Sequence, residues 1–357
     1  MDAAELAGLR APRTFPAISL IMPTHRHRPE NRQDPVRLRS LLDEAGRRLK
    51  ELKQELPRGV ADEIMRSLEK AADQVDPQHA AEALVLFAAA DGDQRAYVLP
   101  RVNVTERIVI GTTYATRDLV AAAQHTWRYW VLALSEQPTR LWAGDGEHLT
   151  EVDNALFPLS WGGTEQAERG TPSDSARRGD FFRHVERAMA EMMKADPRPI
   201  VLLGVQRYLA YFDEYASGSI KEQVAGTVEG NFDKASAAEL LDRVVPVLAA
   251  EQQRWQQSAI DALEPARSER RLASGLEAVW ELAGHGRIAR LVVEQGYLAP
   301  ARESDGRLLP ADSEDGELLE DAVDDLIEAT LNSSGEIVFV PDGSLAEYDR
   351  VAAVLRY

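Results

Sequence analysis

Hydrophobic residues in the first third of the chain occur both in short unbroken runs and at helical spacing, a combination typical of α/β structure. Asp34 and Pro35 stand where a helix would begin, as N-cap and first helical residue. An Asp-Gly-Asp sequence at 91–93 separates two apolar runs and indicates a hairpin turn. The predicted elements are a strand, two helices and a hairpin, at 17–22, 34–56, about 60–74, and 83–89 with 95–99. Together they predict an N-terminal α/β domain over residues 1–125.

The middle of the chain combines a second hairpin pattern with a long polar segment. Residues 158–179 are rich in glycine, serine, threonine and charge, without hydrophobic periodicity, and predict a loop longer than compact domains usually carry without a functional reason. Phenylalanine, valine and methionine then define one face of a helix. The other predicted elements are strands at 130–134, 140–143, 148–152 and 199–204, and a helix that begins at the capping box of Ser236 and Glu239. The pattern predicts a central α/β domain over residues 126–262.

The last part of the chain repeats the α/β theme. Its predicted elements are helices at 272–283 and 318–327 and strands at 289–293, 336–340 and the final residues up to Tyr357. Alternating helices and strands predict an αβα sandwich over residues 263–357. The fold class expected for the whole chain is therefore α/β, with three consecutive α/β domains.

Acidic residues are concentrated near one end of the chain. The formal net charge is −18, which argues against a partner coated in phosphates, because such affinity comes from basic groups. However, residues 301–349 hold 15 acidic side chains against only Arg302 and Arg307. The remaining chain is thus far less acidic. The absence of cysteine and of a long apolar segment predicts a cytoplasmic protein without a membrane span.

Several familiar chemistries lack their sequence signatures. The chain has no glycine loop followed by Lys-Ser or Lys-Thr, no dinucleotide fingerprint and no Gly-x-Ser-x-Gly elbow. His25 and His27 stand two residues apart at the end of a strand without a third ligand cluster, so histidines in a polar loop explain them better than a metal site. The sequence therefore predicts neither a cofactor nor a metal.

The glycine loop and two groups of arginines are the remaining candidates. Gly162 and Gly163 permit unusual backbone paths, and Gln166 offers an amide that both donates and accepts hydrogen bonds. Guanidinium groups can hold phosphate, and the candidate RNA contacts are Arg177, Arg178, Arg183, Arg26, Arg28 and Arg32. The alternative interpretation is a solvated loop and an ordinary charged surface.

The order of several segments resembles the archaeo-eukaryotic peptide-release factor and Pelota superfamily in its bacterial branch. The ending Val351-Ala352-Ala353-Val354-Leu355-Arg356-Tyr357 is similar to the closing strand of that superfamily, and residues 275–293 are similar to its preceding helix, connector and strand. The segments Pro23-Thr24-His25-Arg26 and 229–231 look like signatures of the bacterial branch. The resemblance covers most of residues 17–357 and implies an RNase H-like central domain with a glycine-rich loop.

The resemblance implies a ribosome-binding translation factor whose central loop enters the peptidyl-transferase centre. In the superfamily a Gly-Gly-Gln tip positions water against the peptidyl-tRNA ester. Here the loop has two additional residues, Thr164 and Glu165, between Gly163 and Gln166, which argues against hydrolytic release and less against binding. A role in ribosome rescue or hibernation fits, with the acidic C-terminal domain facing a partner such as a translational GTPase. Two alternatives remain open: an enzyme that hydrolyses peptidyl-tRNA or cleaves tRNA with this loop, and an acidic adaptor without ribosome contact.

Overall fold

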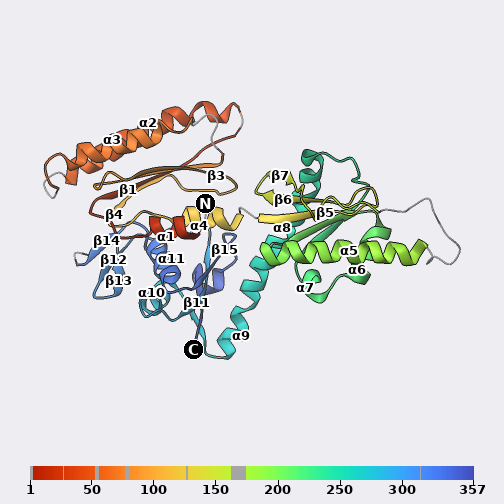
Figure 1. Ribbon diagram of the computed structural model, residues 1–357. Coiled ribbons are helices and arrows are strands. Elements are labelled where there is room, and N and C mark those ends of the chain that lie inside the picture. The colour runs from red at the N-terminus through yellow and green to blue at the C-terminus, as the bar shows by residue number, and fades with distance from the viewer. Residues whose placement is uncertain are drawn as a thin grey trace. The chain divides into compact units, whose positions relative to one another are not determined.

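The computed structural model describes residues 3–26, 28–52, 56–76, 81–125, 128–161, 174–313 and 315–357. It divides into two compact units, one formed by residues 1–125 and 256–357 and the other by residues 126–255 (Figure 1). The first unit contains α1 (Ala3–Leu9), β1 (Ala17–Pro23), η1 (Glu30–Arg32), α2 (Asp34–Glu51), α3 (Val60–Ala72), β2 (Ala83–Ala89), β3 (Gln94–Leu99), β4 (Arg107–Gly111) and α4 (Arg117–His125). It also contains α9 (Leu263–Ser268), β10 (Leu272–Ser274), α10 (Leu276–Gly284), β11 (Ile288–Glu294), β12 (Ala301–Ser304), β13 (Arg307–Pro310), β14 (Glu317–Leu319), α11 (Ala322–Asn332), β15 (Glu336–Val340), η4 (Ala346–Tyr348) and β16 (Val351–Leu355).

The N-terminal part of the first unit is an antiparallel sheet in the order β3-β2-β1-β4. Figure 1 shows α2 and α3 lying over one face of this sheet, and alternate residues of β1 and β2 pack against them. The remaining residues of these strands point to the other face and join a second core. Because both faces are covered, β1 and β2 are almost continuously apolar rather than alternating.

The C-terminal part is a mixed sheet in the order β10-β16-β11-β15, in which β15 runs parallel to β11. Helices α10 and α11 pack against this sheet in the same core that receives β1, β2 and α4. The first and third predicted domains therefore share one hydrophobic core. The C-terminal segment of this unit begins at residue 256, seven residues before the predicted boundary at 263. The three-domain division remains a prediction, because a shared core does not decide whether each part folds alone.

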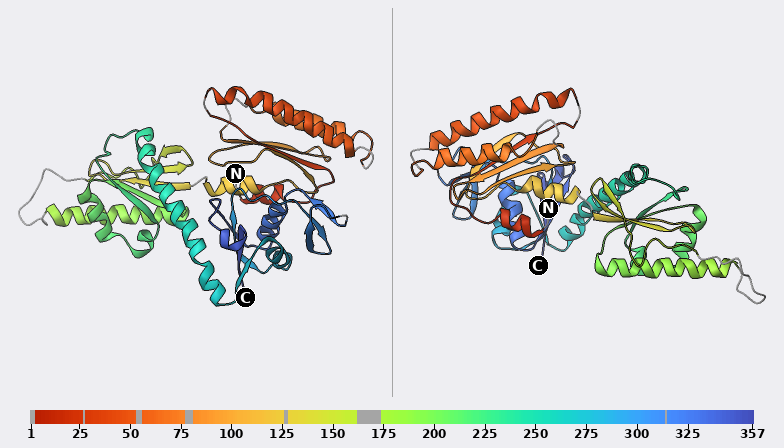
Figure 2. Two further views of the ribbon diagram at one scale, coloured as in Figure 1. Left: turned by 180° about the vertical axis from the view of Figure 1, so that it is seen from behind. Right: turned by 45° about the horizontal axis from the view of Figure 1, so that its top comes forward.

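The second unit is built on a five-stranded sheet in the order β7-β6-β5-β8-β9. The elements of this unit are β5 (Arg128–Ala133), β6 (Arg140–Asp145), β7 (His148–Glu151), α5 (Asp174–Ala195), β8 (Ile200–Gly204), α6 (Gln206–Tyr215), α7 (Gly218–Lys221), β9 (Val224–Glu229) and most of α8 (Ala237–Asp261). Helices α5 and α6 pack on one face, and α8 packs on the other (Figure 2).

Its strand order is that of the RNase H-like fold. The first three strands form an antiparallel meander, and β8 and β9 then add in parallel to β5. The mixed α/β class predicted from the sequence is confirmed, and this strand order is consistent with the RNase H-like central domain that the resemblance implied.

Three local predictions were wrong in their boundaries. The helix expected at 272–283 is divided into β10 and α10, because Gly275 lies between them with φ +80° and begins α10 in a conformation that few other residues adopt. The loop expected at 158–179 ends earlier, since α5 begins at Asp174. Asp34 is the first residue of α2 rather than its N-cap, which is Gln33.

Candidate functional site

The loop between β1 and α2 is closed by a carboxylate. Asp34 is completely buried and accepts two hydrogen bonds from His25, one from the backbone N–H at 2.8 Å and one from the ring Nδ1 at 2.9 Å. Thr24 Oγ1 donates a hydrogen bond to the carbonyl oxygen of Ala81 at 3.0 Å. This contact holds the start of the loop against the segment that precedes β2. Asp34 thus joins the two ends of the segment and presents the residues between them as a compact loop.

This loop carries three of the predicted RNA-contacting arginines, and the structure distinguishes them. Arg26 is only one-third exposed, and its Nε lies 2.6 Å from Oε1 of Glu82, so much of its charge is neutralised inside the protein. Arg28 and Arg32 are exposed and form no ion pair with any residue that the structure describes. They therefore present full positive charges to solvent, whereas Arg26 supports the base of the loop.

The charge around this loop differs in sign from that of the whole chain. Residues 25–50 contain eight basic side chains and four acidic ones, although the chain has a net charge of −18. One of the four acidic residues is the buried Asp34, whose carboxylate is hydrogen-bonded to His25. The surface near the start of α2 is thus a local basic region. It attracts polyanions most strongly at low ionic strength, where salt screens these charges least.

The second group of predicted residues lies at the start of α5. Gly162, Gly163 and Gln166 lie outside the described residues. Arg177 and Arg178 belong to the first turns of α5 rather than to a loop, and their side chains are likewise outside the description.

Arg183 is the member of this group whose side chain is described. It is about half exposed, forms an ion pair with Asp180 one turn earlier, and places its guanidinium carbon 4.7 Å from the centroid of the Tyr215 ring. An exposed pair at this spacing contributes little to stability and exchanges readily for another anion. Gly179 makes the approach of Tyr215 possible, because a Cβ atom at this position would lie 2.6 Å from the tyrosine oxygen.

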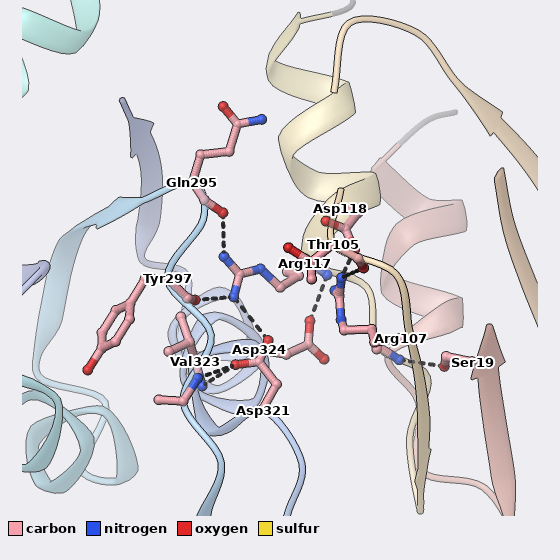
Figure 3. Close-up of polar contacts among 12 residues, drawn as sticks. Ser19, Thr105, Arg107, Arg117, Asp118, Gln295, Tyr297, Asp321, Val323 and Asp324 are labelled. Atoms are coloured by element: carbon pink, nitrogen blue, oxygen red, sulfur yellow. Dashed lines mark hydrogen bonds and ion pairs between the residues drawn. The ribbon is translucent and has the colours of Figure 1, made fainter. Parts of the chain in front are cut away.

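A buried ionic cluster, absent from the sequence-based predictions, joins the two ends of the chain within the first unit (Figure 3). Arg117 is 2% exposed, its Nη1 lies 3.0 Å from Asp321 Oδ2, and its guanidinium also donates to the carbonyl oxygens of Gln295 and Tyr297. The backbone N–H of Arg117 donates to Asp324 Oδ1 at 2.7 Å. Every charged group of this cluster has an internal partner, so its role is to fasten α4 to the C-terminal part.

The electrostatics of the cluster follow from its burial. Desolvation raises the pKa of Asp324 well above its ordinary value, and the nearby carboxylates of Asp321 and Asp325 raise it further. Burial alone would lower the pKa of Arg107, but Asp118 and the other carboxylates raise it above its ordinary value. The sequence signal was weak, because an arginine at the start of a helix does not reveal a carboxylate two hundred residues later.

The described residues offer no other chemistry of a familiar kind. Among them, no three histidine, cysteine, aspartate or glutamate side chains are placed to hold a metal ion, and His27 lies outside this set. In the same part of the chain, no helix combines the length and apolar character that crossing a membrane requires. The arrangement that remains is a set of exposed guanidinium groups on two surfaces, which is suited to binding phosphate.

A comparison with protein families matches residues 128–287 to bacterial archaeo-eukaryotic release factor family 3. The matched segment contains the RNase H-like sheet, α5 and the start of the C-terminal part. In this segment, sequence and fold are therefore similar to those of bacterial release-factor-like proteins. The match covers a little under half of the chain, and it agrees with the resemblance to the bacterial branch of the archaeo-eukaryotic release factor superfamily that the sequence motifs indicated.

Solved structures of similar proteins are distant in sequence. An archaeal Pelota in a model of ribosome-bound Pelota and ABCE1 is 17% identical, with coverage of 74% of this chain and 72% of that chain and a TM-score of 0.44. Pelota of Archaeoglobus fulgidus is 16% identical, with 77% and 79% covered and a TM-score of 0.37. Dom34 of S. cerevisiae, a termination-like factor that interacts with Hbs1, is 12% identical, with 77% and 79% covered and a TM-score of 0.44. These scores are too low to transfer any structural detail. Among curated proteins, none matches the chain.

Proposed function

We propose that this chain is a ribosome-binding translation factor that acts on stalled or idle ribosomes without reading a stop codon. The match of residues 128–287 to a bacterial release factor family supports a role in translation. Rescue and hibernation both require tight contact with ribosomal RNA, and neither requires hydrolysis by the protein itself. The cytoplasmic location predicted from the sequence belongs to this proposal.

The observation that carries the proposal is the pair of unneutralised arginines in the loop after β1. Arg28 and Arg32 are exposed and without an ionic partner in the described part of the chain, and Asp34 holds the loop that presents them. Within the protein, these two arginines make no ion pair with a described residue that would account for their placement. Phosphate oxygens are the partners to which guanidinium groups bind best.

The start of α5 supplies the second proposed contact. Arg183, ordered by Tyr215, would bind phosphate beside Arg177 and Arg178, and the preceding loop with Gly162, Gly163 and Gln166 would extend toward the peptidyl-transferase centre. In this proposal the loop fills space near the end of the tRNA.

The acidic C-terminal segment would face away from RNA. Its excess of carboxylates over residues 301–349 repels phosphate and favours a protein partner. Dom34 is described as interacting with Hbs1, and an archaeal Pelota as ribosome-bound with ABCE1. A translational GTPase is the corresponding partner that we propose for this chain.

Co-sedimentation with purified ribosomes at low salt tests the proposal. The wild-type chain is expected to pellet with ribosomes, and the Arg28→Ala/Arg32→Ala variant is expected to bind about tenfold more weakly because two phosphate contacts are lost. The matched control is Arg243→Ala/Arg270→Ala, which removes the same charge from two other exposed arginines.

Three results would contradict the proposal: no pelleting of the wild type, equal binding by both double variants, or binding that does not weaken as salt rises. The first would favour an adaptor without ribosome contact. The second would favour general charge attraction over contact by this loop.

A further inference from the structure

A cavity in the first unit lies between two sheet edges. It has a volume of about 470 Å³ and is lined on one side by residues 109–112, at the end of β4, and on the other by residues 318–321, at the end of β14. Strand β4 is the last strand of the N-terminal sheet, and β14 is the last strand of the small sheet β13-β12-β14. Neither has a second strand partner among the described residues.

The backbone of β4 has hydrogen-bonding groups that face this cavity. Arg48 Nη1 donates to the carbonyl oxygen of Ile108 at 2.7 Å, on the side of β4 away from β1. Alternate residues of an antiparallel strand direct their backbone groups to the same side, so the N–H and C=O of Ile110 also face away from β1. An open edge of this kind is a template for another strand.

The edge of β15 provides an instructive contrast. There, the side-chain amide of Gln124 donates to the carbonyl oxygen of Ile337 and accepts from the N–H of Phe339, and Gln256 also donates to Phe339. The chain thus covers the edge of β15 with two glutamines. Within the described residues, a side chain covers the outer edge of β4 at Ile108 but not at Ile110.

Apolar side chains are exposed at the same place. The described part of the chain has five large hydrophobic residues that are clearly exposed, and two of them, Phe15 at 39% and Leu318 at 50%, line this cavity. Exposed apolar groups that gather beside an open sheet edge indicate a binding surface more strongly than scattered ones do.

The charge around the cavity selects the chemistry of an occupant. Among the described residues of the lining, the one basic side chain is Arg48, which is already paired with Glu320, whereas Glu51 is exposed. Residues 301–325, which include β12, β13 and β14, contain ten acidic side chains and two basic ones. An occupant with lysine or arginine beside its apolar residues would be attracted, and an acidic one would be repelled.

We propose that this cavity binds an extended segment of a protein partner, in which apolar residues alternate with lysine or arginine, and that the segment adds as a strand to β4 at Ile110. Backbone hydrogen bonds supply part of the affinity, and apolar side chains at alternate positions enter the space beside Phe15 and Leu318. The carboxylates around the cavity bind the basic residues on the opposite face of the added strand. This surface is separate from the arginines proposed to contact RNA.

A labelled synthetic peptide that alternates valine and lysine tests the proposal on the full chain by fluorescence anisotropy. Two variants remove different parts of the site. Leu318→Gln removes an apolar contact and is expected to weaken binding about fivefold. Ile110→Pro removes the outward N–H while leaving the ladder with β1 intact, and it is expected to weaken binding about tenfold. Val36→Gln, at a 72% exposed position of α2 that does not line the cavity, is the control and should bind like the wild type.

Hydrogen exchange locates the bound peptide. Added peptide should slow exchange of the backbone amides in 107–112, and a serine–lysine peptide of equal charge should bind at least fivefold more weakly. Equal binding of the two peptides, equal binding by Leu318→Gln and Val36→Gln, or absence of binding would overturn the proposal. If the chain forms a dimer that Ile110→Pro dissociates, a second copy covers this edge and the proposed partner is wrong.

Discussion

Replacing Glu328 by glutamine should stabilise the protein at pH 8 and have little effect near pH 5. Glu328 lies on α11 and is buried, which raises its pKa from 4.5 to about 7. The neighbouring Asp324 also raises this pKa, whereas a hydrogen bond from Thr113 and the charge of Arg10 oppose the shift. Between pH 4.5 and about pH 7, Glu328 is protonated in the folded chain and ionised in the unfolded chain. Stability therefore falls as pH rises through this window, and the loss is complete above pH 7.

The magnitude follows from the two pKa values. A change from 4.5 to about 7 corresponds to a destabilisation of at most about 3 kcal/mol at pH 8, because each tenfold change in the proton affinity is worth about 1.4 kcal/mol. Glutamine keeps the size of the side chain and can still pair with Thr113, but it carries no charge at any pH. The expected gain at pH 8 is thus about 1–3 kcal/mol, which allows for partial relaxation around the ionised group.

Urea unfolding followed by circular dichroism at pH 5 and pH 8 measures this difference. The control is Glu277→Gln, at an exposed position of α10, which should change stability by less than about 0.5 kcal/mol at both pH values. Asp324 has a raised pKa as well, so the wild type loses stability for more than one reason, and the variants are compared with it at each pH. A glutamine variant that is equally stable relative to wild type at pH 5 and pH 8, or less stable at pH 8, would refute the reasoning.

Three further outcomes are expected. Arg117→Met should lower the free energy of unfolding by about 3–5 kcal/mol in urea titrations, because it leaves Asp321 buried without its partner; a loss below about 1 kcal/mol would contradict this. Gly179→Ala should leave the thermal midpoint nearly unchanged but displace Tyr215 and weaken ribosome binding in co-sedimentation, and unaltered binding would count against the role of this surface. Ribosomes that carry peptidyl-tRNA should release peptide at the same background rate with wild type and Gln166→Ala, and release by the wild type alone would establish hydrolysis instead.

Local elements were predictable from the sequence because their signals are local. The strand predicted at 17–22 and the hairpin around 91–93 follow from a mostly apolar run and a turn sequence, and both are confirmed. The division at Gly275 was missed because the apolar residues on either side continue a helical spacing, and the positive φ of the glycine decides the boundary.

Long-range partnerships were not predictable from spacing. Nothing in the sequence near Arg117 indicates Asp321, and nothing in the first or last hundred residues indicates that both contribute to one core. The candidate arginines were found by charge alone, so the sequence could not separate Arg26, which pairs with Glu82, from Arg28 and Arg32, which do not pair with any described residue. His25 was considered as a metal ligand, whereas its contact with Asp34 shows that it fastens the loop.

The salt dependence of ribosome binding tests the central claim most directly. The dissociation constant of the wild type and of Arg28→Ala/Arg32→Ala is measured over a series of potassium concentrations. If these arginines contact phosphate, the logarithm of the affinity falls linearly with the logarithm of salt concentration, and the slope for the double variant is smaller by about 1 to 2. Identical slopes for the two proteins, or an affinity that salt does not change, would contradict the claim that this loop binds ribosomal RNA.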